Sequence, residues 1–160
     1  MNNTADGRSI VIVTYDDRFS DAFDRLNREW LTAYVLFEES DRKHLEHPRQ
    51  SIVATGGEVF FALRDDVVVG TCAVVWCADE TVELVKLSVA REARGCGLGR
   101  RLTETAISWA RKHGARRVVL LSSTKLDAAL RLYERMGFRY GPLPDDPTYA
   151  SADVFMELAL

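Results

Sequence analysis

Three apolar stretches rich in β-branched residues fill the middle of the chain. They run over Val59–Leu63, Val67–Trp76 and Thr81–Val89, and the acidic pairs Asp65-Asp66 and Asp79-Glu80 separate them. Such runs are typical of strands, and short polar turns between strands favour neighbouring antiparallel pairs. This part of the sequence therefore predicts an antiparallel meander.

Helical spacing of apolar residues appears on both sides of this meander. One set follows Asp17, which we expect to be the N-cap, and consists of Phe19, Phe23, Leu26, Trp30, Ala33 and Phe37. Their period places them on one face of a helix. Further helices are predicted over Asp41–Glu46, from a glycine-rich loop to about His113, and over Leu126–Met136.

The remaining apolar runs predict four more strands. They are Ile10–Tyr15, Val118–Leu121, a strand beginning at Phe138–Gly141, and Asp153–Leu158. Because Val118–Leu121 is continuously apolar, we expect it to be buried on both faces. Together the elements predict an α/β fold with a mixed, mostly antiparallel sheet flanked by helices.

Length and charge narrow the possible functions. The chain has 160 residues, 47% hydrophobic and 28% charged, with a net charge of −3. These values favour one domain over 1–160, with a core over about 10–160, and give no general reason to expect a nucleic-acid partner. No apolar run is long enough to span a bilayer, and Met1–Ser9 lacks the apolar core of a signal peptide. We expect a cytoplasmic protein that does not bind membranes.

Cysteine and histidine positions argue against metal or disulfide chemistry. The chain has an odd number of cysteines, three, and no two of them have CxxC spacing: they are Cys72, Cys77 and Cys96. His44 and His47 lie three residues apart, but no further ligand spacing accompanies them. We expect no metal site.

A glycine-rich loop follows the last strand of the meander and leads into a helix. Its residues are Arg94, Gly95, Cys96, Gly97, Leu98, Gly99 and Arg100. Glycine lets an anion approach the backbone, and the free amides at a helix start attract it, so a phosphate-bearing cofactor is predicted here. A dinucleotide GxGxxG motif is ruled out by Arg100, and no Gly-Lys-Ser/Thr follows. A glycine-rich turn without a ligand is the alternative.

Two motifs together resemble the GNAT acetyltransferase superfamily. The first is Arg94-x-x-Gly97-x-Gly99 after a strand, and the second is the run from Ala129 to Phe138, which is similar to Ala-x-x-Leu-Tyr-x-x-x-Gly-Phe. A weaker likeness extends from about Ile10 to the C-terminus. The resemblance implies the GNAT-type acyl-CoA N-acyltransferase fold and acetyl-CoA as cosubstrate, with its pyrophosphate on the loop amides.

The resemblance also implies roles for individual residues. Tyr133 would protonate the departing thiolate, and a phenol suits this because it keeps its proton at neutral pH. Leu87, Ser88 and Val89 would bind the pantetheine arm, and an amide of Leu87 or Ser88 would polarise the acetyl carbonyl. Glu83, eleven residues before Arg94, matches the glutamate that accepts the amine proton in histone-type members. A solvated carboxylate is the alternative for Glu83.

The resemblance further implies acceptor contacts from the first helices and from the loop before the last strand. The candidates are Asn27, Glu29, Tyr34 and Tyr149. One position departs from the family pattern, since Leu126 stands where many members carry an asparagine that bonds the cofactor arm. Ser122, Ser123 or Thr124 is a candidate source of a replacement hydroxyl.

The sequence thus predicts an N-acetyltransferase that moves an acetyl group from acetyl-CoA to a primary amine by direct attack in a ternary complex. The acceptor is expected to be a small molecule, and a homodimer is a candidate assembly. The alternative function is an acyl-CoA-binding sensor or structural module of the same fold without turnover.

Overall fold

The computed structural model of the chain describes residues 4–5, 8–145 and 150–160. Its strands are β1 (Thr4–Ala5), β2 (Arg8–Val13), β3 (Glu58–Arg64), β4 (Val67–Ala78), β5 (Thr81–Val89), β6 (Arg117–Ser122), β7 (Arg139–Gly141) and β8 (Val154–Ala159). Its α-helices are α1 (Ser20–Ala33), α2 (Glu39–Glu46), α3 (Leu98–Lys112) and α4 (Asp127–Arg135). Three shorter helical turns are η1 (Asp17–Phe19), η2 (Arg49–Val53) and η3 (Arg91–Ala93).

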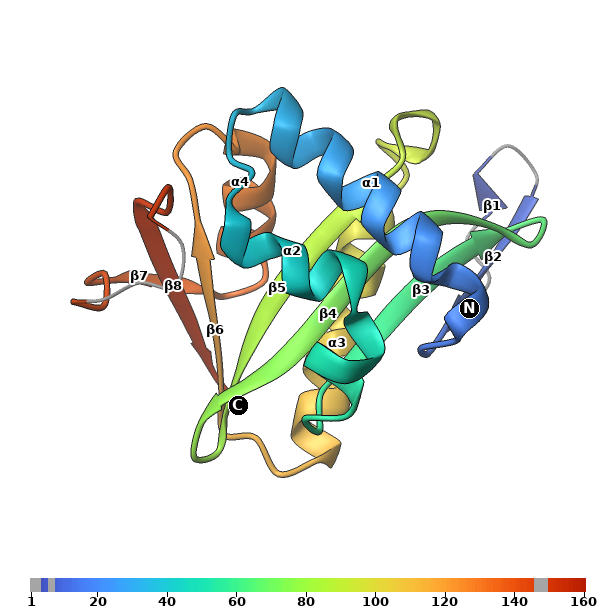
Figure 1. Ribbon diagram of the computed structural model, residues 1–160. Helices are drawn as coiled ribbons and strands as arrows, with labels where there is room; N and C mark the ends of the chain where they lie inside the picture. Colours follow the sequence, from blue (N-terminus) through green and yellow to red (C-terminus); the bar gives the residue numbers. More distant parts are fainter. Residues whose placement is uncertain (1–3, 6–7, 146–149) are drawn as a thin grey trace.

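The strands form one mixed sheet in the order β1-β2-β3-β4-β5-β6-β8-β7. Every neighbouring pair is antiparallel except β5 and β6, which are parallel. The expected meander is β3-β4-β5, and the expected fold class, a mixed and mostly antiparallel sheet flanked by helices, is confirmed. The strand that comes last in the sequence, β8, is inserted between β6 and β7 (Figure 1).

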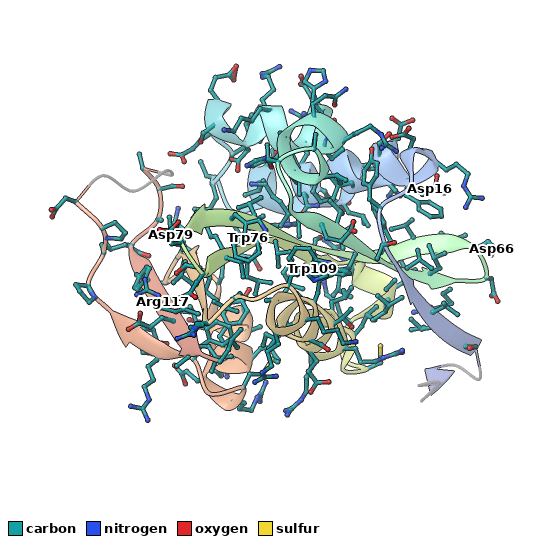
Figure 2. The ribbon with its side chains drawn as sticks, turned by 90° about the horizontal axis from the view of Figure 1, so that it is seen from below. Asp16, Asp66, Trp76, Asp79, Trp109 and Arg117 are labelled. Atoms are coloured by element: carbon teal, nitrogen blue, oxygen red, sulfur yellow. The ribbon has the colours of Figure 1, made fainter. Side chains whose placement is uncertain are left out.

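Helices cover both faces of the sheet. Figure 1 shows α1 and α2 in front of it, and Figure 2 shows α3 and α4 on the opposite side. Helix α3 lies close to β4 because Gly70 has no Cβ, which would lie 2.9 Å from Leu102 Cδ1. Trp76 of β4 also meets Trp109 of α3, with ring centroids 6.4 Å apart (Figure 2). Within the described residues, no helix combines the length and apolar composition needed to cross a membrane.

A bulge interrupts β5 at the centre of the sheet. Thr71 pairs with Ser88 and Ala73 pairs with Val85, so β5 has one residue more than β4 between these two pairs. Lys86 lies in the bulge with a φ of 55°, a left-handed conformation that is rare for a residue with a side chain. The Thr71 hydroxyl donates a 2.9 Å hydrogen bond to the Lys86 carbonyl, and the buried Asn27 amide of α1 donates to the same hydroxyl at 3.0 Å. These two bonds tie the bulge to β4 and α1.

Some element boundaries differ from the sequence predictions. Asp17 is not the N-cap of α1, because Asp16 accepts the Arg18 amide and caps η1, after which α1 begins at Ser20. Helix α2 begins two residues earlier than expected, because Glu38 and Asp41 form a capping box. Glutamate is not among the usual N-cap residues, so this start has only a weak signal in the sequence.

Replacing Thr71 by valine tests the support of the bulge. The change keeps the side-chain shape but leaves the buried Lys86 carbonyl without its hydroxyl donor, so we expect a loss of roughly 1–3 kcal/mol in the free energy of unfolding. The matched control is Thr103→Val. Thr103 is equally buried, and its hydroxyl donates a hydrogen bond to the Gly99 carbonyl within the same helix, α3. The control should lose under about 1 kcal/mol. Equal losses in denaturant titrations of both variants would contradict the assignment.

Candidate functional site

The site begins where β5 and β6 part. The two strands pair only over Thr81–Glu83 and Arg117–Val119, although β5 continues to Val89 and β6 to Ser122. A cavity of about 300 Å³ lies along this divergence. It is lined by Trp30, Leu31, Tyr34, Leu36, Asp41, Glu83, Leu84, Val85, Lys86, Leu87, Ser88, Val89, Arg94, Leu121, Ser122, Ser123, Leu126, Asp127, Ala128, Ala129, Tyr133, Ser151 and Ala152.

The glycine-rich loop lies at the end of β5 and opens α3. Gly95 and Gly97 have φ values of 81° and 80°, which favour glycine. A Cβ at Gly95 would meet nothing within 4 Å, so the space beside the backbone is open. Gly97 is the N-cap of α3 and supplies no side-chain cap, which leaves the first amides of the helix available to an anion. The start of α3 therefore has free backbone amides and open space beside Gly95.

Tyr133 reaches the cavity from α4, on the β6 side of the divergence. The side chain is 7% exposed, and its ring lies 5.6 Å from that of Phe138, centroid to centroid. Burial raises the pKa of the Tyr133 phenol well above its usual range, with a smaller contribution from Cys72. The phenol thus keeps its proton at neutral pH and can donate it.

Glu83 enters the cavity from β5, at the last residue that pairs with β6. Burial raises the pKa of the Glu83 carboxyl, and the Lys86 ammonium opposes this shift by favouring the charged form. A carboxylate with a raised pKa is a better proton acceptor than a solvated one at neutral pH. Glu83 is partly buried in the cavity lining.

A buried ion pair, which sequence reasoning missed, lines the same cavity. Lys86 of the bulge contacts Asp41 of α2, and their side chains are 5% and 2% exposed. The other Asp41 oxygen accepts the Glu38 amide at 2.8 Å, so one carboxylate caps α2 and neutralises the lysine. The available signal was the single charged residue in the run from Leu84 to Val89.

The wall opposite β5 is mostly apolar and comes from the end of α1 and the loop that follows it. Trp30, Leu31 and Leu36 form it, together with the half-exposed Tyr34. The Trp30 indole N–H donates to the Asn27 side-chain oxygen at 3.1 Å, away from the cavity residues. Trp30 can therefore offer its carbon ring to a ligand.

Most of the predicted site residues converge on this cavity. Tyr133, Glu83, Leu87, Ser88, Val89, Arg94 and Tyr34 line it directly. Gly95, Cys96, Gly97, Leu98, Gly99 and Arg100 form the adjoining loop and the start of α3. Glu29 lines a smaller neighbouring cavity of about 130 Å³, which also includes Trp30, Tyr34, Ser88, Val89 and Arg94.

Two predicted residues of the described structure have other surroundings. Asn27 is fully buried, does not line the cavity, and bonds Phe23, Thr71 and Trp30, so its role is to support the bulge and the wall. Thr124 is also absent from the lining, because Asp153 accepts both its hydroxyl and its amide. Ser122 and Ser123 do line the cavity, beside Leu126. Tyr149 lies outside the described residues.

The described part of the chain contains no group of three or more histidine, cysteine, aspartate or glutamate side chains placed to hold a metal ion. His44 instead packs inside the protein on α2, where its Nδ1 lies 3.0 Å from the Ser51 hydroxyl. Its role is thus in the packing of the helix that carries Asp41.

Comparison with known proteins gives a consistent result. The model of the acetyltransferase (GNAT) family matches residues 19–138. Among curated proteins, "Probable N-acetyltransferase camello" of Xenopus laevis is 42% identical over 62 residues, which cover 39% of this chain and 28% of that protein. In this match and in two others to curated N-acetyltransferases, the chain spans less than half of the relative's length.

Two solved structures share the fold. An acetyltransferase of the GNAT family from Staphylococcus aureus Mu50 superposes with a TM-score of 0.86 and 18% identity, over 94% of this chain and 99% of that one. The PaiA N-acetyltransferase of Thermoplasma acidophilum, in complex with coenzyme A, has a TM-score of 0.76 and 19% identity, over 95% and 99% of the two chains.

The buried His44 predicts a dependence of stability on pH. Burial lowers the pKa of His44 to about 4 from 6.5, with help from the positive charge of Lys86. The unfolded chain binds a proton between these two values and the folded chain does not. The contribution of His44 to the free energy of unfolding is therefore fully present above pH 6.5. It is lost as the pH drops toward 4, and the loss amounts to at most about 3 kcal/mol.

Denaturant titrations at about pH 7 and about pH 5 measure this effect. His44→Gln should lose less stability than the wild type between the two values, because the titrating ring is gone. His47→Gln, a change at an exposed position at the end of the same helix, should keep the wild-type loss. A loss in His44→Gln as large as that of the wild type would show that other groups cause it.

Proposed function

Because the chain belongs to the acetyltransferase (GNAT) family, we propose that it transfers an acetyl group from acetyl-CoA to a primary amine of a small molecule by direct attack in a ternary complex. The observation that carries this proposal is the parting of β5 from β6. It leaves one cavity where the glycine-rich loop, Tyr133 and Glu83 converge.

The loop from Arg94 to Arg100 would hold the pyrophosphate of the acetyl-CoA. The left-handed glycines, the open space at Gly95 and the uncapped start of α3 support this assignment. The pantetheine arm would then follow β5 along Leu87, Ser88 and Val89, much as an added strand follows a sheet edge. Arg94, the first residue of the loop, is linked to the end of β5, because its Nε donates a hydrogen bond to the Val89 carbonyl at 3.1 Å.

The acyl transfer needs two proton movements. The amine nitrogen attacks the thioester carbonyl carbon, a C–N bond forms, and Glu83 accepts the proton that the nitrogen loses. The C–S bond then breaks and Tyr133 donates its phenolic proton to the leaving sulfur. A backbone amide of Leu87 or Ser88 would stabilise the charge on the carbonyl oxygen between the two events.

Release of free CoA thiol from acetyl-CoA tests the proposal. The acceptors are pools of amines, and mass spectrometry of the product identifies the acetylated compound. Acceptor-dependent release with an amide product supports an N-acetyltransferase. Saturable binding of acetyl-CoA without release in any pool would instead favour the binding module of the same fold.

Replacing Tyr133 by phenylalanine isolates the phenolic proton. The ring and its packing against Phe138 are kept, so we expect an unchanged KM for acetyl-CoA and a kcat lowered by about 100-fold. The control is Tyr140→Phe, since Tyr140 is exposed and its hydroxyl bonds Glu134 on α4. An unchanged kcat in Tyr133→Phe would remove the proton donor from the proposed mechanism.

Replacing Glu83 by glutamine isolates the proton acceptor. Glu83 must be ionised to accept a proton, and burial raises its pKa. The catalytic efficiency of the wild type, kcat/KM, should therefore fall as the pH drops through that raised pKa. At about pH 8, Glu83→Gln should have a kcat/KM about 100-fold below that of the wild type. Its kcat/KM should no longer show the fall at low pH, the acidic limb of the profile, that the wild type shows.

The control for this experiment is Glu46→Gln, at an exposed position on α2. It should keep both the rate and the pH profile of the wild type. If Glu83→Gln retained the acidic limb, another group would be the acceptor of the amine proton.

A further inference from the structure

The charges around the cavity are distributed unevenly between its donor and acceptor parts. Two cations line it among the described residues, Lys86 and Arg94. Arg94 belongs to the glycine-rich loop, on the donor side. The acceptor part is formed by β5 near Glu83 and by the wall of Trp30, Leu31 and Leu36, so Lys86 is the cation that belongs to this part.

Lys86 is already neutralised by the protein itself. Its ammonium is held by Asp41, and both side chains are almost completely buried. A carboxylate on the acceptor would have to compete with Asp41 for this ammonium in a site where ion pairs are costly to rearrange. It would also lie near the Glu83 carboxylate, which has the same sign, and bringing like charges together is unfavourable.

Three carboxylates line the cavity among the described residues. Asp41 is paired with Lys86, and Asp127 is exposed in the first turn of α4, so Glu83 is the carboxylate that β5 contributes to the acceptor part. That group suits the reacting ammonium before it loses its proton. A second ammonium on the same molecule would meet Leu31 and Leu36 in the wall, whose side chains offer it neither a charge nor a hydrogen-bond acceptor. Burying a charge against apolar side chains is unfavourable.

The wall itself suits an apolar group. The Trp30 indole N–H bonds Asn27, and Leu31 and Leu36 are 5% and 7% exposed, so the surface offered to a ligand is largely carbon. Tyr34 extends this surface to the mouth of the cavity, where the residue is 45% exposed. Apolar and aromatic groups gain most from such contacts.

We propose that the acceptor is a primary amine on an apolar, preferably aromatic, body that has neither a carboxylate nor a second ammonium close to the reacting nitrogen. This inference rests on the proposed function and names its substrate class. Asp41 and Trp30 are the residues that set the specificity, the first by neutralising Lys86 and the second by contacting the apolar body.

Four compounds in matched pairs test the inference in the thiol-release assay. Phenethylamine and L-phenylalanine differ by one carboxylate, whereas butylamine and diaminobutane differ by one ammonium. Phenethylamine should react with a kcat/KM more than about 100-fold above that for L-phenylalanine. Its advantage over butylamine should be about 10-fold, because the ring fills more of the apolar wall. The diamine should react no faster than butylamine.

The possible failures are distinguishable. If L-phenylalanine or diaminobutane is the best acceptor, the substrate class is wrong and the proposed function stands. If none of the four compounds releases thiol but another amine of the pools does, the substrate class is wrong and the proposed function stands. If no amine releases thiol while acetyl-CoA binds, the proposed function fails and the inference falls with it.

Variants at Trp30 test the wall directly. Trp30→Ala should raise the KM for phenethylamine by about 10-fold and leave that for acetyl-CoA unchanged. Trp30→Phe loses the same hydrogen bond to Asn27 but keeps a ring, so it should restore most of the affinity. Equal KM values in both variants would show that the hydrogen bond, and not the ring, matters.

Asp41→Asn tests the neutralisation of Lys86. With the carboxylate removed, the lysine can bind an acceptor carboxylate, so the preference for phenethylamine over L-phenylalanine should narrow by at least about 10-fold. An unchanged preference in a folded variant would contradict the role of Asp41. Thermal unfolding shows whether the variant is folded, and if it is not, the Trp30 variants and the four compounds decide.

Discussion

Lys86 is the residue on which the architecture of the site depends. Its backbone makes the bulge in β5 in a left-handed conformation, its carbonyl is held by Thr71, and its ammonium is held by Asp41. A charge so deeply buried must be paired, and breaking such a pair is strongly destabilising. The position of α2 and the course of β5 are therefore fixed together.

The two groups proposed to move protons share one physical cause for their altered acidity. Burial raises the pKa of both Glu83 and Tyr133, because it disfavours the charged form of each. For Tyr133 this keeps the proton available for donation. For Glu83 it strengthens the basicity of the carboxylate, while Lys86 limits the shift so that the group can still be ionised. Burial in one cavity thus shifts the pKa of both groups in the direction that their proposed roles require.

The sequence predicted most of the fold, because its strands and helices have strong periodic patterns. It also predicted that the glycine-rich loop leads into a helix and that Tyr133 lies on a helix, because short motifs of neighbouring residues indicate both. The contact between Asp41 and Lys86 could not be predicted in this way, because 45 positions separate the two residues and each looks like an ordinary charge. Asn27 was expected to contact the acceptor, yet helix periodicity could not show that its amide is needed by Thr71. Each of these contacts joins a helix to a strand more than 40 positions away in the sequence, so the local pattern of either segment does not encode it.

The place of β8 in the sheet has a consequence for how the protein is made. A ribosome synthesises β6 before β8, and at that stage β6 can pair with β5 over only three residues on each strand. Six residue pairs with β8 hold β6 in place. Thr124, in the loop after β6, adds two hydrogen bonds by donating its amide and hydroxyl to Asp153. Domains generally fold as units during synthesis, so one wall of the cleft is settled only after β8 has left the exit tunnel. A nascent chain can thus contain the whole glycine-rich loop and still have no site in which to use it.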